Sequence, residues 1–151
     1  MGYVAGPRPP GGCVLCEAPS TGDDRARFLL LRGTHGYLIL NTYPYAGGHL
    51  MAVLYRHIAT LAEATGDELA ELMMLTARAT TLLDAEYGAE GFNVGLNQGR
   101  AAGAGIAEHL HMHVVPRWNG DANFMTVVGE VRVLPEALDT TYDRLKRRLH
   151  G

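Results

Sequence analysis

Three histidines alternate with apolar residues in the segment His109-Leu110-His111-Met112-His113-Val114-Val115. Side chains of a β-strand point alternately to its two faces, so this pattern predicts three imidazoles on one face. Imidazole titrates near neutral pH and serves as a nucleophile, an acid, a base or a metal ligand. His109 and His113 would lie roughly 13 Å apart at ~3.3 Å per residue, too far to bind the same ion comfortably. Several alternatives are open. Neighbouring histidines could share a metal, or the outer ones could sit in different sites. One imidazole could be catalytic and flanked by two others, or the row could be a polar stripe on an exposed strand.

A glycine-rich loop, Asn97–Gly105 (NQGRAAGAG), comes shortly before these histidines. Its glycines allow tight turns that expose backbone N–H groups to an anion. The loop is not a P-loop, because no Gly-Lys-Ser/Thr follows, and it is not a dinucleotide-binding fingerprint, because it leads into a strand. Next to a row of imidazoles, the loop favours a phosphate-binding site.

The two cysteines of the chain are spaced C-x-x-C, at Cys13 and Cys16. This spacing is half of a zinc site, but a redox pair or two packed thiols fit it as well. With so few cysteines and no secretion signal read at the N-terminus, we expect a reducing compartment and a cytoplasmic location. Residues 1–12 are rich in Gly and Pro and are expected to form a flexible N-terminal arm.

Composition limits the function further. The 151 residues are 47% hydrophobic, and 13 Lys and Arg face 16 Asp and Glu, which gives a net charge of −3. This length fits one domain with a real core. The chain lacks the basic surplus of proteins that bind long nucleic acids and the apolar run of roughly 18 residues that a membrane span needs. Any phosphate that it binds is therefore expected on a small molecule.

The helices and strands that must position these residues can be predicted from the hydrophobic pattern, whose period changes along the chain between that of a strand and that of a helix. Thr65 and Glu68 form a capping box before a helix that Gly88 ends. The expected apolar face of this helix is Leu69, Leu72, Met73, Thr76, Ala79, Leu83 and Tyr87. Pro135 is expected to open a final helix. The expected strands are Phe28–Arg32, Tyr37–Asn41, His49–Leu54, Phe92–Leu96 and His109–Val115, stopped by Pro116, with a last hairpin over Phe124–Val128 and Val131–Leu134. This order predicts an α+β fold with helices on one face of an antiparallel sheet.

The loop and the segment His109-x-His111-x-His113-Val114-Val115-Pro116-Arg117 together resemble the histidine triad (HIT) superfamily of nucleotide hydrolases and transferases. Trp118-Asn119-Gly120-Asp121-Ala122-Asn123-Phe124 looks most like the branch with diadenosine tetraphosphate phosphorylases and hydrolases. The resemblance implies a HIT domain over residues 13–151. It also implies about five antiparallel strands packed against a long central helix and a C-terminal helix, and commonly a homodimer.

The resemblance implies that the protein cleaves the α-phosphoryl bond of dinucleoside polyphosphates through a nucleotidyl-histidine, with water or phosphate as the acceptor. His111 would be the nucleophile, and His113 would contact phosphate at the reacting centre. The other implied nucleotide-binding residues are Leu15, Ile39, Asn41, Thr42, His49, Asn97, Gly103, Ala104 and Gly105. The stretch Gly103–Ile106 lacks the side-chain donor that many members have there, so backbone amides would replace it.

In HIT relatives with C-x-x-C, two histidines complete a structural zinc site. Those ligands resemble His57 and His109 here, which would join Cys13 and Cys16 around Zn²⁺.

Three other functions are kept as alternatives: a purine nucleoside phosphoramidase-like hydrolase, a nucleotide-binding sensor with negligible turnover, and an interaction module stabilised by zinc. Each makes a different prediction for turnover and for nucleotide binding.

Overall fold

The computed structural model describes residues 12–43, 47–121 and 136–150. The expected N-terminal arm, apart from Gly12, lies outside these residues. So do the hairpin expected over 124–134 and the helix start expected at Pro135.

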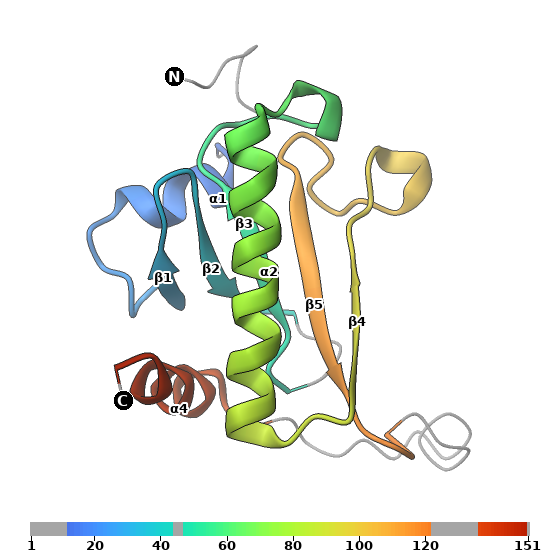
Figure 1. The fold of residues 1–151 in the computed structure, drawn as a ribbon. Coiled ribbons are helices and arrows are strands. Elements are labelled where there is room, and N and C mark those ends of the chain that lie inside the picture. The colour runs from blue at the N-terminus through green and yellow to red at the C-terminus, as the bar shows by residue number, and fades with distance from the viewer. Residues whose placement is uncertain (1–11, 44–46, 122–135, 151) are drawn as a thin grey trace.

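Five antiparallel strands form one sheet in the order β1-β2-β3-β5-β4 (Figure 1). The strands are β1 (Leu29–Arg32), β2 (Gly36–Leu40), β3 (Leu50–Leu54), β4 (Gly91–Gly95) and β5 (His111–Arg117). Strand β5, which carries His111 and His113, is therefore paired on both sides: Val53 of β3 pairs with His111, and Gly95 of β4 pairs with His113. The expected α+β fold with about five strands is confirmed.

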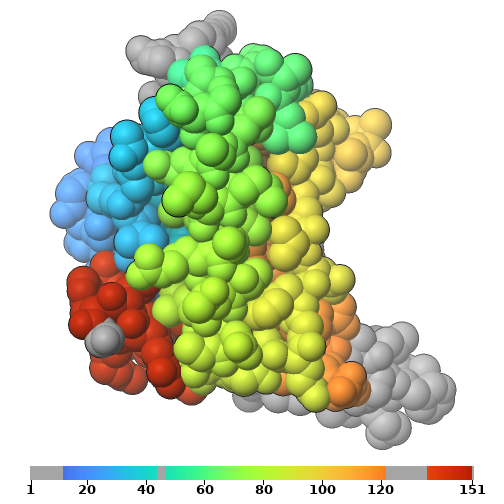
Figure 2. Space-filling model, viewed as in Figure 1, coloured from blue at the N-terminus to red at the C-terminus, as the bar shows by residue number. Residues whose placement is uncertain are grey.

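A long helix, α2 (Gly66–Tyr87), runs across one face of the sheet, and α4 (Leu138–His150) packs against α2 and β1 (Figure 1). Figure 2 shows α2 on the surface of this face, flanked by α4 and by β4. The shorter elements are α1 (Val14–Glu17) and the 3₁₀ turns η1 (Ala18–Ser20), η2 (Leu61–Glu63) and η3 (Arg100–Ala102). Neither helix α2 nor any other helix of the described residues is long and apolar enough to cross a membrane.

The ends of α2 follow the sequence prediction. The Thr65 hydroxyl accepts a hydrogen bond from the Glu68 N–H at 3.1 Å, and the Glu68 carboxylate accepts one from the Thr65 N–H at 2.8 Å. These two bonds form the predicted capping box. Gly88 ends the helix in the left-handed region, with φ of 59°.

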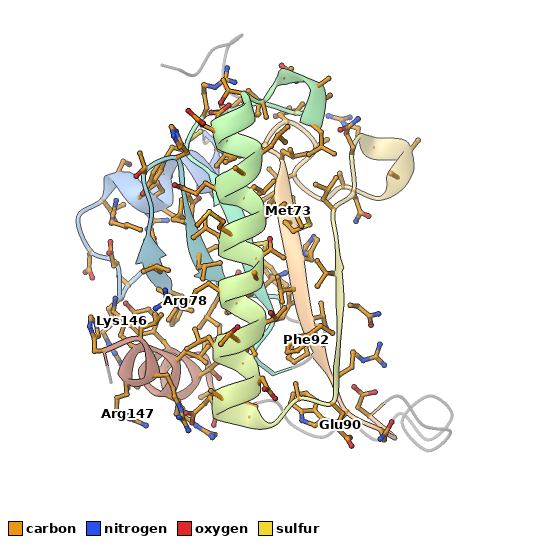
Figure 3. The ribbon with its side chains drawn as sticks, viewed as in Figure 1. Met73, Arg78, Glu90, Phe92, Lys146 and Arg147 are labelled. Atoms are coloured by element: carbon orange, nitrogen blue, oxygen red, sulfur yellow. The ribbon has the colours of Figure 1, made fainter. Side chains whose placement is uncertain are left out.

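The predicted apolar face of α2 is partly wrong. Met73 is 56% exposed (Figure 3), whereas Leu75 and Leu82 are buried although they were not predicted. Successive residues are separated by about 100° around a helix, so Met73 lies about 100° from the buried Leu72 and turns away from the sheet. Leu69 is half-buried, at the border of the face.

Two apolar clusters lie on opposite faces of the sheet, because strand side chains alternate. The first joins α2 and α4 to the sheet and contains Met112 and Val114 of β5. The second contains Cys13, Leu15, Ala18, Leu29, Tyr37, Ile39, Met51 and Val53. The short helix α1 therefore covers part of the face that was expected to carry no helix. Four residues have no periodicity from which this helix could be predicted.

The prediction that Pro116 stops the histidine strand is wrong, since β5 continues to Arg117. The Arg117 carbonyl accepts a hydrogen bond from the Glu90 N–H, so the backbone of Arg117 faces β4 and that of Pro116 faces away from β4. On that side the pairing with β3 ends at Val114. Pro116 thus lacks an N–H where the ladder requires none, and the strand tolerates it.

Candidate metal centre and candidate active site

The row of three histidines divides between two groups of side chains. Strand β5 begins at His111, and His109 lies just before it, where the Leu110 N–H donates to the Ile58 carbonyl at 2.7 Å. The His109 ring contacts the His57 ring, with 5.0 Å between centroids. The His111 ring instead contacts His113, at 4.9 Å. Alternate histidines of one segment therefore belong to two different sites.

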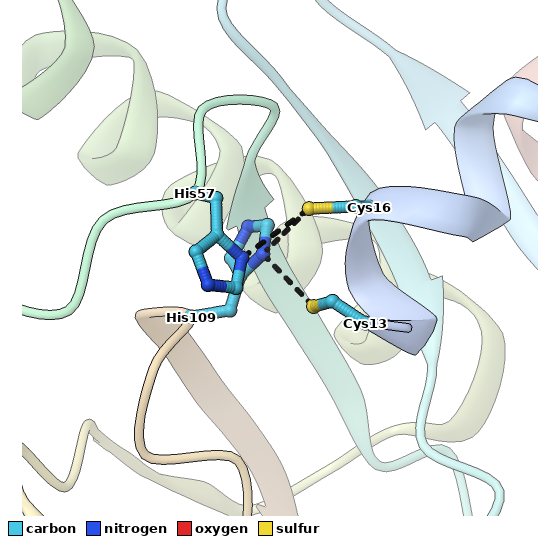
Figure 4. A group of neighbouring side chains, drawn as sticks. All are labelled: Cys13, Cys16, His57 and His109. Atoms are coloured by element: carbon cyan, nitrogen blue, oxygen red, sulfur yellow. Dashed lines mark hydrogen bonds between the residues drawn. The ribbon is translucent and has the colours of Figure 1, made fainter. Parts of the chain in front are cut away.

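The first group is a cluster of two thiols and two imidazoles, Cys13, Cys16, His57 and His109, which we call the metal centre (Figure 4). One ligand atom from each residue lies within 4.8 Å of all the others. The His109 Nδ1 is 3.3 Å from Cys13 Sγ and 3.4 Å from Cys16 Sγ, and the His57 Nδ1 is 3.3 Å from Cys16 Sγ. All four predicted ligands are thus brought together and are positioned to bind a metal ion.

The geometry of this cluster fits a tetrahedral ion. With metal–sulfur bonds of about 2.3 Å and metal–nitrogen bonds of about 2.05 Å, a tetrahedron has S···N edges of about 3.5 Å. The three measured S···N distances are close to that value. The His109 Nε2 lies 2.8 Å from the Leu54 carbonyl oxygen, which can only accept, so Nε2 carries the proton and Nδ1 presents its lone pair to the centre. A carbonyl that accepts a hydrogen bond from the other ring nitrogen of a metal-binding histidine fixes the orientation of the ring.

Local structure explains how the two thiols converge. Cys13 is the residue before α1, and its carbonyl accepts hydrogen bonds from the N–H groups of Cys16 and Glu17. This turn brings Cys13 and Cys16 to one side of the segment. The buried Tyr37 hydroxyl donates to the Leu15 carbonyl and so anchors the turn to β2. Burial holds the pKa of His109 down to about 4, which keeps its imidazole neutral, as ligation requires.

The second group is formed by His49, His111 and His113, which we call the histidine cluster. The His111 Nδ1 lies 2.8 Å from the His109 carbonyl oxygen, so Nδ1 is the protonated nitrogen. In the neutral ring the lone pair is then on Nε2. His111 is 6% exposed and stands at the start of β5, where the chain arrives from the glycine loop. This arrangement gives one imidazole a fixed tautomer and a nucleophilic nitrogen.

His113 and His49 form a hydrogen-bonded pair on neighbouring strands. The His49 Nε2 is 2.9 Å from the His113 Nδ1, and the Asn41 amide nitrogen is 3.4 Å from the His49 ring. Burial, followed by the nearby His113 and His111, lowers the pKa of His49 to about 4. Burial also lowers the pKa of His113. Both rings are therefore neutral at pH 7, so one imidazole donates the hydrogen bond and the other accepts it.

The glycine loop closes the end of the sheet beside the histidine cluster. It leaves β4 after Gly95, which pairs with His113, and it returns to the sheet at His111. Gly99 and Gly103 have φ of 88° and 89°, which side chains rarely adopt, so the turn around η3 needs both glycines. The Gly103 N–H donates to the Arg100 carbonyl and the Ala104 N–H to the Gly99 carbonyl. Two of the three amides expected to hold phosphate are thus used within the turn. Among the residues that the structure describes, none accepts a hydrogen bond from the Gly105 N–H.

The remaining residues expected to contact nucleotide differ in burial. Leu15 and Ile39 are buried in the second apolar cluster, at 2% and 6% exposure. Asn41 is half-buried, Thr42 is exposed, and Asn97 is exposed in the glycine loop. The Asn41 side-chain oxygen accepts a hydrogen bond from the Tyr43 N–H at 2.8 Å. Their nucleotide-binding roles stay predictions.

Three groups that organise the two sites were missed in the sequence. They are the carbonyl oxygens of Leu54 and His109 and the hydroxyl of Tyr37. A backbone carbonyl has the same chemistry at every position, so only the fold reveals which one faces an imidazole. Tyr37 stands within an apolar strand, where it reads as an ordinary core residue.

Comparison with known proteins finds a matching family model and related proteins. The model of the HIT domain matches residues 26–120. An AP-4-A phosphorylase of Mycobacterium tuberculosis is 47% identical over 125 residues, which is 83% of this chain and 64% of that protein. The chain therefore spans less than two thirds of the length of this relative. A HIT-like protein of Methanocaldococcus jannaschii is 27% identical over 92% of this chain and 99% of its own length.

Solved structures share the fold. A Zn-bound histidine triad family protein from Mycobacterium smegmatis superposes with a TM-score of 0.74 and 24% identity, over 91% of this chain and 93% of its own. The diadenosine triphosphate hydrolase of Plasmodium falciparum superposes with a TM-score of 0.69 and 16% identity, over 85% and 78% of the two chains. At these identities the likeness concerns the fold.

Proposed function

The chain belongs to the HIT domain family, and we propose that it is a nucleotide-processing enzyme that cleaves dinucleoside polyphosphates at the α-phosphorus. The similarity to the AP-4-A phosphorylase of Mycobacterium tuberculosis supports a substrate such as diadenosine tetraphosphate. Because the chain spans 64% of that relative, the activity is proposed for the region that the two proteins share. A homodimer and a cytoplasmic location, both expected from the sequence, stay predictions.

One observation carries the proposal: the His111 Nδ1 donates to the His109 carbonyl, which leaves the Nε2 lone pair as the nucleophile. In the first step Nε2 attacks the α-phosphorus, a P–N bond forms, and the P–O bond to the leaving nucleoside polyphosphate breaks with its electron pair. In the second step an acceptor oxygen attacks the same phosphorus, and the P–N electron pair returns to Nε2. Two displacements through a covalent intermediate replace one difficult displacement.

The neighbouring imidazoles would bind the reacting phosphate. His113 lies beside His111 on the same face of β5, and the Nδ1 of His113 is hydrogen-bonded to the Nε2 of His49. When His49 accepts the proton of His113 Nδ1, the His113 Nε2 bears a lone pair; when His49 donates, the His113 Nε2 bears the proton and can donate to a phosphate oxygen. The second tautomer is the one we propose for the complex with substrate. The Gly105 amide and the Asn97 side chain would add donors from the glycine loop.

We propose zinc as the ion of the metal centre, with Cys13, Cys16, His57 and His109 as its ligands. Two thiolates and two imidazoles in a tetrahedral arrangement suit Zn²⁺. With four protein ligands the ion has no open position, so it would supply structural stability rather than a reactive water. The ligands would tie α1 to the end of β3 and to the start of β5. A redox pair of Cys13 and Cys16 is the alternative, and zinc analysis of the purified protein separates the two.

The acceptor in the second step is proposed to be phosphate, as the name of the phosphorylase relative suggests. Product analysis tests this choice, since phosphate as acceptor yields a nucleoside diphosphate and water yields a nucleoside monophosphate. The reaction is run with and without added phosphate, and the two nucleotides are separated by chromatography. A monophosphate product at every phosphate concentration would assign the protein as a hydrolase.

A nucleotide-binding sensor is the second candidate, because two of the loop amides are used within the turn and Gly103–Ile106 offers no side-chain donor. The deciding experiment compares the wild-type protein, His111→Ala and the control His35→Ala, whose histidine lies in the β1–β2 turn outside both sites. The proposed enzyme turns over diadenosine tetraphosphate in the wild type and in the control but not in His111→Ala. Micromolar nucleotide binding without product in all three proteins would instead identify a sensor.

A further inference from the structure

His109 joins the metal centre to the histidine cluster. Its Nδ1 faces Cys13 Sγ at 3.3 Å and Cys16 Sγ at 3.4 Å, while its Nε2 donates to the Leu54 carbonyl. Its own carbonyl oxygen accepts the proton of His111 Nδ1 at 2.8 Å. The residue is fully buried. One amino acid therefore contacts the ligand atoms of the first site and orients the nucleophile of the second.

The backbone around His109 is held by few other bonds. The His109 N–H donates to the Ile106 carbonyl at 3.3 Å, a long bond, and the Leu110 N–H donates to the Ile58 carbonyl at 2.7 Å. Pairing with β3 starts only at His111. The peptide that carries the His109 carbonyl is thus anchored at two points, the His109 ring and the bond between Leu110 and Ile58. Both points belong to the metal centre or adjoin it, because the ring lies between the two thiols and Ile58 follows the ligand His57.

We propose that the bound metal ion positions the nucleophile, with His109 as the positioning residue. When the ion holds Nδ1 of His109, the His109 carbonyl is fixed and keeps the proton of His111 on Nδ1. Without the ion, the His109 peptide shifts and His111 populates both neutral tautomers. The kinetic part of this inference rests on the proposed function, whereas the structural part does not.

The rest of the domain is expected to stay folded when the ion is removed. Tyr37 anchors α1 through the Leu15 carbonyl, and Leu15 itself is 2% exposed in the second apolar cluster. The first apolar cluster, between α2 and the sheet, contains none of the four ligands. The coupling between the two sites is therefore local and can be measured in a folded protein.

The first test records imidazole nitrogen NMR spectra of the zinc-loaded protein and of the protein stripped by a chelator under reducing conditions. The expected result is a single Nδ1–H tautomer for His111 with zinc and a mixture of tautomers without it. Methyl signals of the first apolar cluster serve as the folding reference. This readout needs no substrate, so it stands even if the proposed function fails.

A second variant guards against unfolding of the stripped protein. His57→Ala removes the ligand that contacts Cys16 and leaves the His109 carbonyl, which orients His111, in the chain. Its weakened site can be filled in steps by adding zinc. The His111 tautomer should follow the zinc occupancy while the methyl signals stay unchanged. Loss of the methyl signals in parallel with the tautomer would overturn the local coupling, because the ion would then support the fold as a whole.

The kinetic test separates positioning from binding. In single-turnover reactions, the stripped protein should transfer the nucleotidyl group about 10- to 100-fold more slowly, the range found when outer-shell contacts are lost. The nucleotide dissociation constant should change by less than about 3-fold, and added zinc should restore the rate. An unchanged His111 tautomer and an unchanged rate in the stripped, folded protein would overturn the proposal. If the loaded protein has no His111-dependent activity, the proposed function fails and the NMR result alone decides the inference.

Discussion

The metal centre and the histidine cluster use the same residue type on one short segment, but opposite ring nitrogens are fixed. His109 donates through Nε2 to the Leu54 carbonyl and turns Nδ1 toward two thiols. His111, two residues later, donates through Nδ1 to the His109 carbonyl and keeps its lone pair on Nε2. The Nδ1 of His109 is one of four potential ligand atoms that lie close together. Among the described residues, His111 belongs to no such group.

This difference shows that the backbone carbonyl to which a histidine donates determines which ring nitrogen is left to bind or react. Imidazole offers two nitrogens, and the one that donates to a carbonyl determines which one keeps the lone pair. The surroundings then separate the two sites, since thiols favour a metal and a glycine loop favours phosphate. Four predictions test the comparison.

The largest effect is expected when the two histidines are removed one at a time. His111→Ala should reduce turnover by about 10³-fold or more, because it removes the nucleophile, and should leave the zinc content at one per chain. His109→Ala should lose zinc and slow turnover about 10- to 100-fold, because the carbonyl that orients His111 remains but loses the anchor of its ring. Steady-state assays and metal analysis on the same samples measure both effects. A His111→Ala protein that lacks zinc would contradict the separation of the two sites.

Zinc should stabilise the protein only through the four ligands of the metal centre. Free zinc at 100 times its dissociation constant adds about 2.7 kcal/mol to the free energy of unfolding. For a domain of this size that corresponds to a rise of roughly 5–10 °C in Tm. The double variant Cys13→Ser/Cys16→Ser should show no such rise, whereas His111→Ala should respond like the wild type. Thermal unfolding at several zinc concentrations provides the measurement.

A smaller effect is expected at the partner of His113. His49→Phe keeps an aromatic ring at this buried position but removes the 2.9 Å bond to His113 Nδ1. A lost partner of a buried polar group costs about 1–3 kcal/mol, so kcat/KM should fall roughly 10- to 100-fold. Zinc affinity should not change, which a chelator competition assay can check. A matched His35→Phe variant controls for the new aromatic ring, and equal losses in both variants would argue against the role of His49.

The smallest effect is expected on the free energy of unfolding, through the segment that leads to His57. Arg56 donates two hydrogen bonds to the Glu68 carboxylate, and these bonds lower the pKa of Glu68 from 4.5 to about 2. Because the folded pKa is the lower one, the stabilisation is present above about pH 4.5 and is lost as the pH falls toward 2.

Glu68→Gln should therefore cost about 1–2 kcal/mol at pH 7, and this difference from the wild type should shrink steadily below about pH 4.5. Urea unfolding at pH 7 and at pH 3.5 measures both values. Turnover at saturating zinc should not change. A difference that grows on acidification would show that the pKa of Glu68 is not lowered by Arg56.

Much of the site could be predicted from the sequence because it depends on spacing. The capping box at Thr65 and the left-handed Gly88 follow from local chemistry, and the structure contains both. The four metal ligands also converge as the resemblance implied. Met112 and Val114 alternate with the histidines and lie in the apolar cluster under α2, as the two-residue period of a strand requires.

Other features depend on contacts between distant segments and could not be predicted. Pro116 continues β5 only because β3 ends before it. The amides of Gly103 and Ala104 serve the 3₁₀ turn, although the glycine pattern alone suggested that they point toward a ligand. Met73 follows the expected helical period, but the sheet contacts a face centred nearer Leu72 and Ala79. The departures at Pro116 and Met73 come from packing between distant segments, whereas the hydrogen bonds of Gly103 and Ala104 lie within one turn.

The most direct test of the account is to capture the nucleotidyl group on the protein. The wild-type protein is mixed with diadenosine tetraphosphate, quenched in alkaline denaturant within milliseconds, digested and examined by mass spectrometry. We predict an added adenylyl group on His111, absent from His111→Ala and from the unreacted protein. Normal turnover with no adduct on any residue, or with the adduct on a residue other than His111, would contradict it.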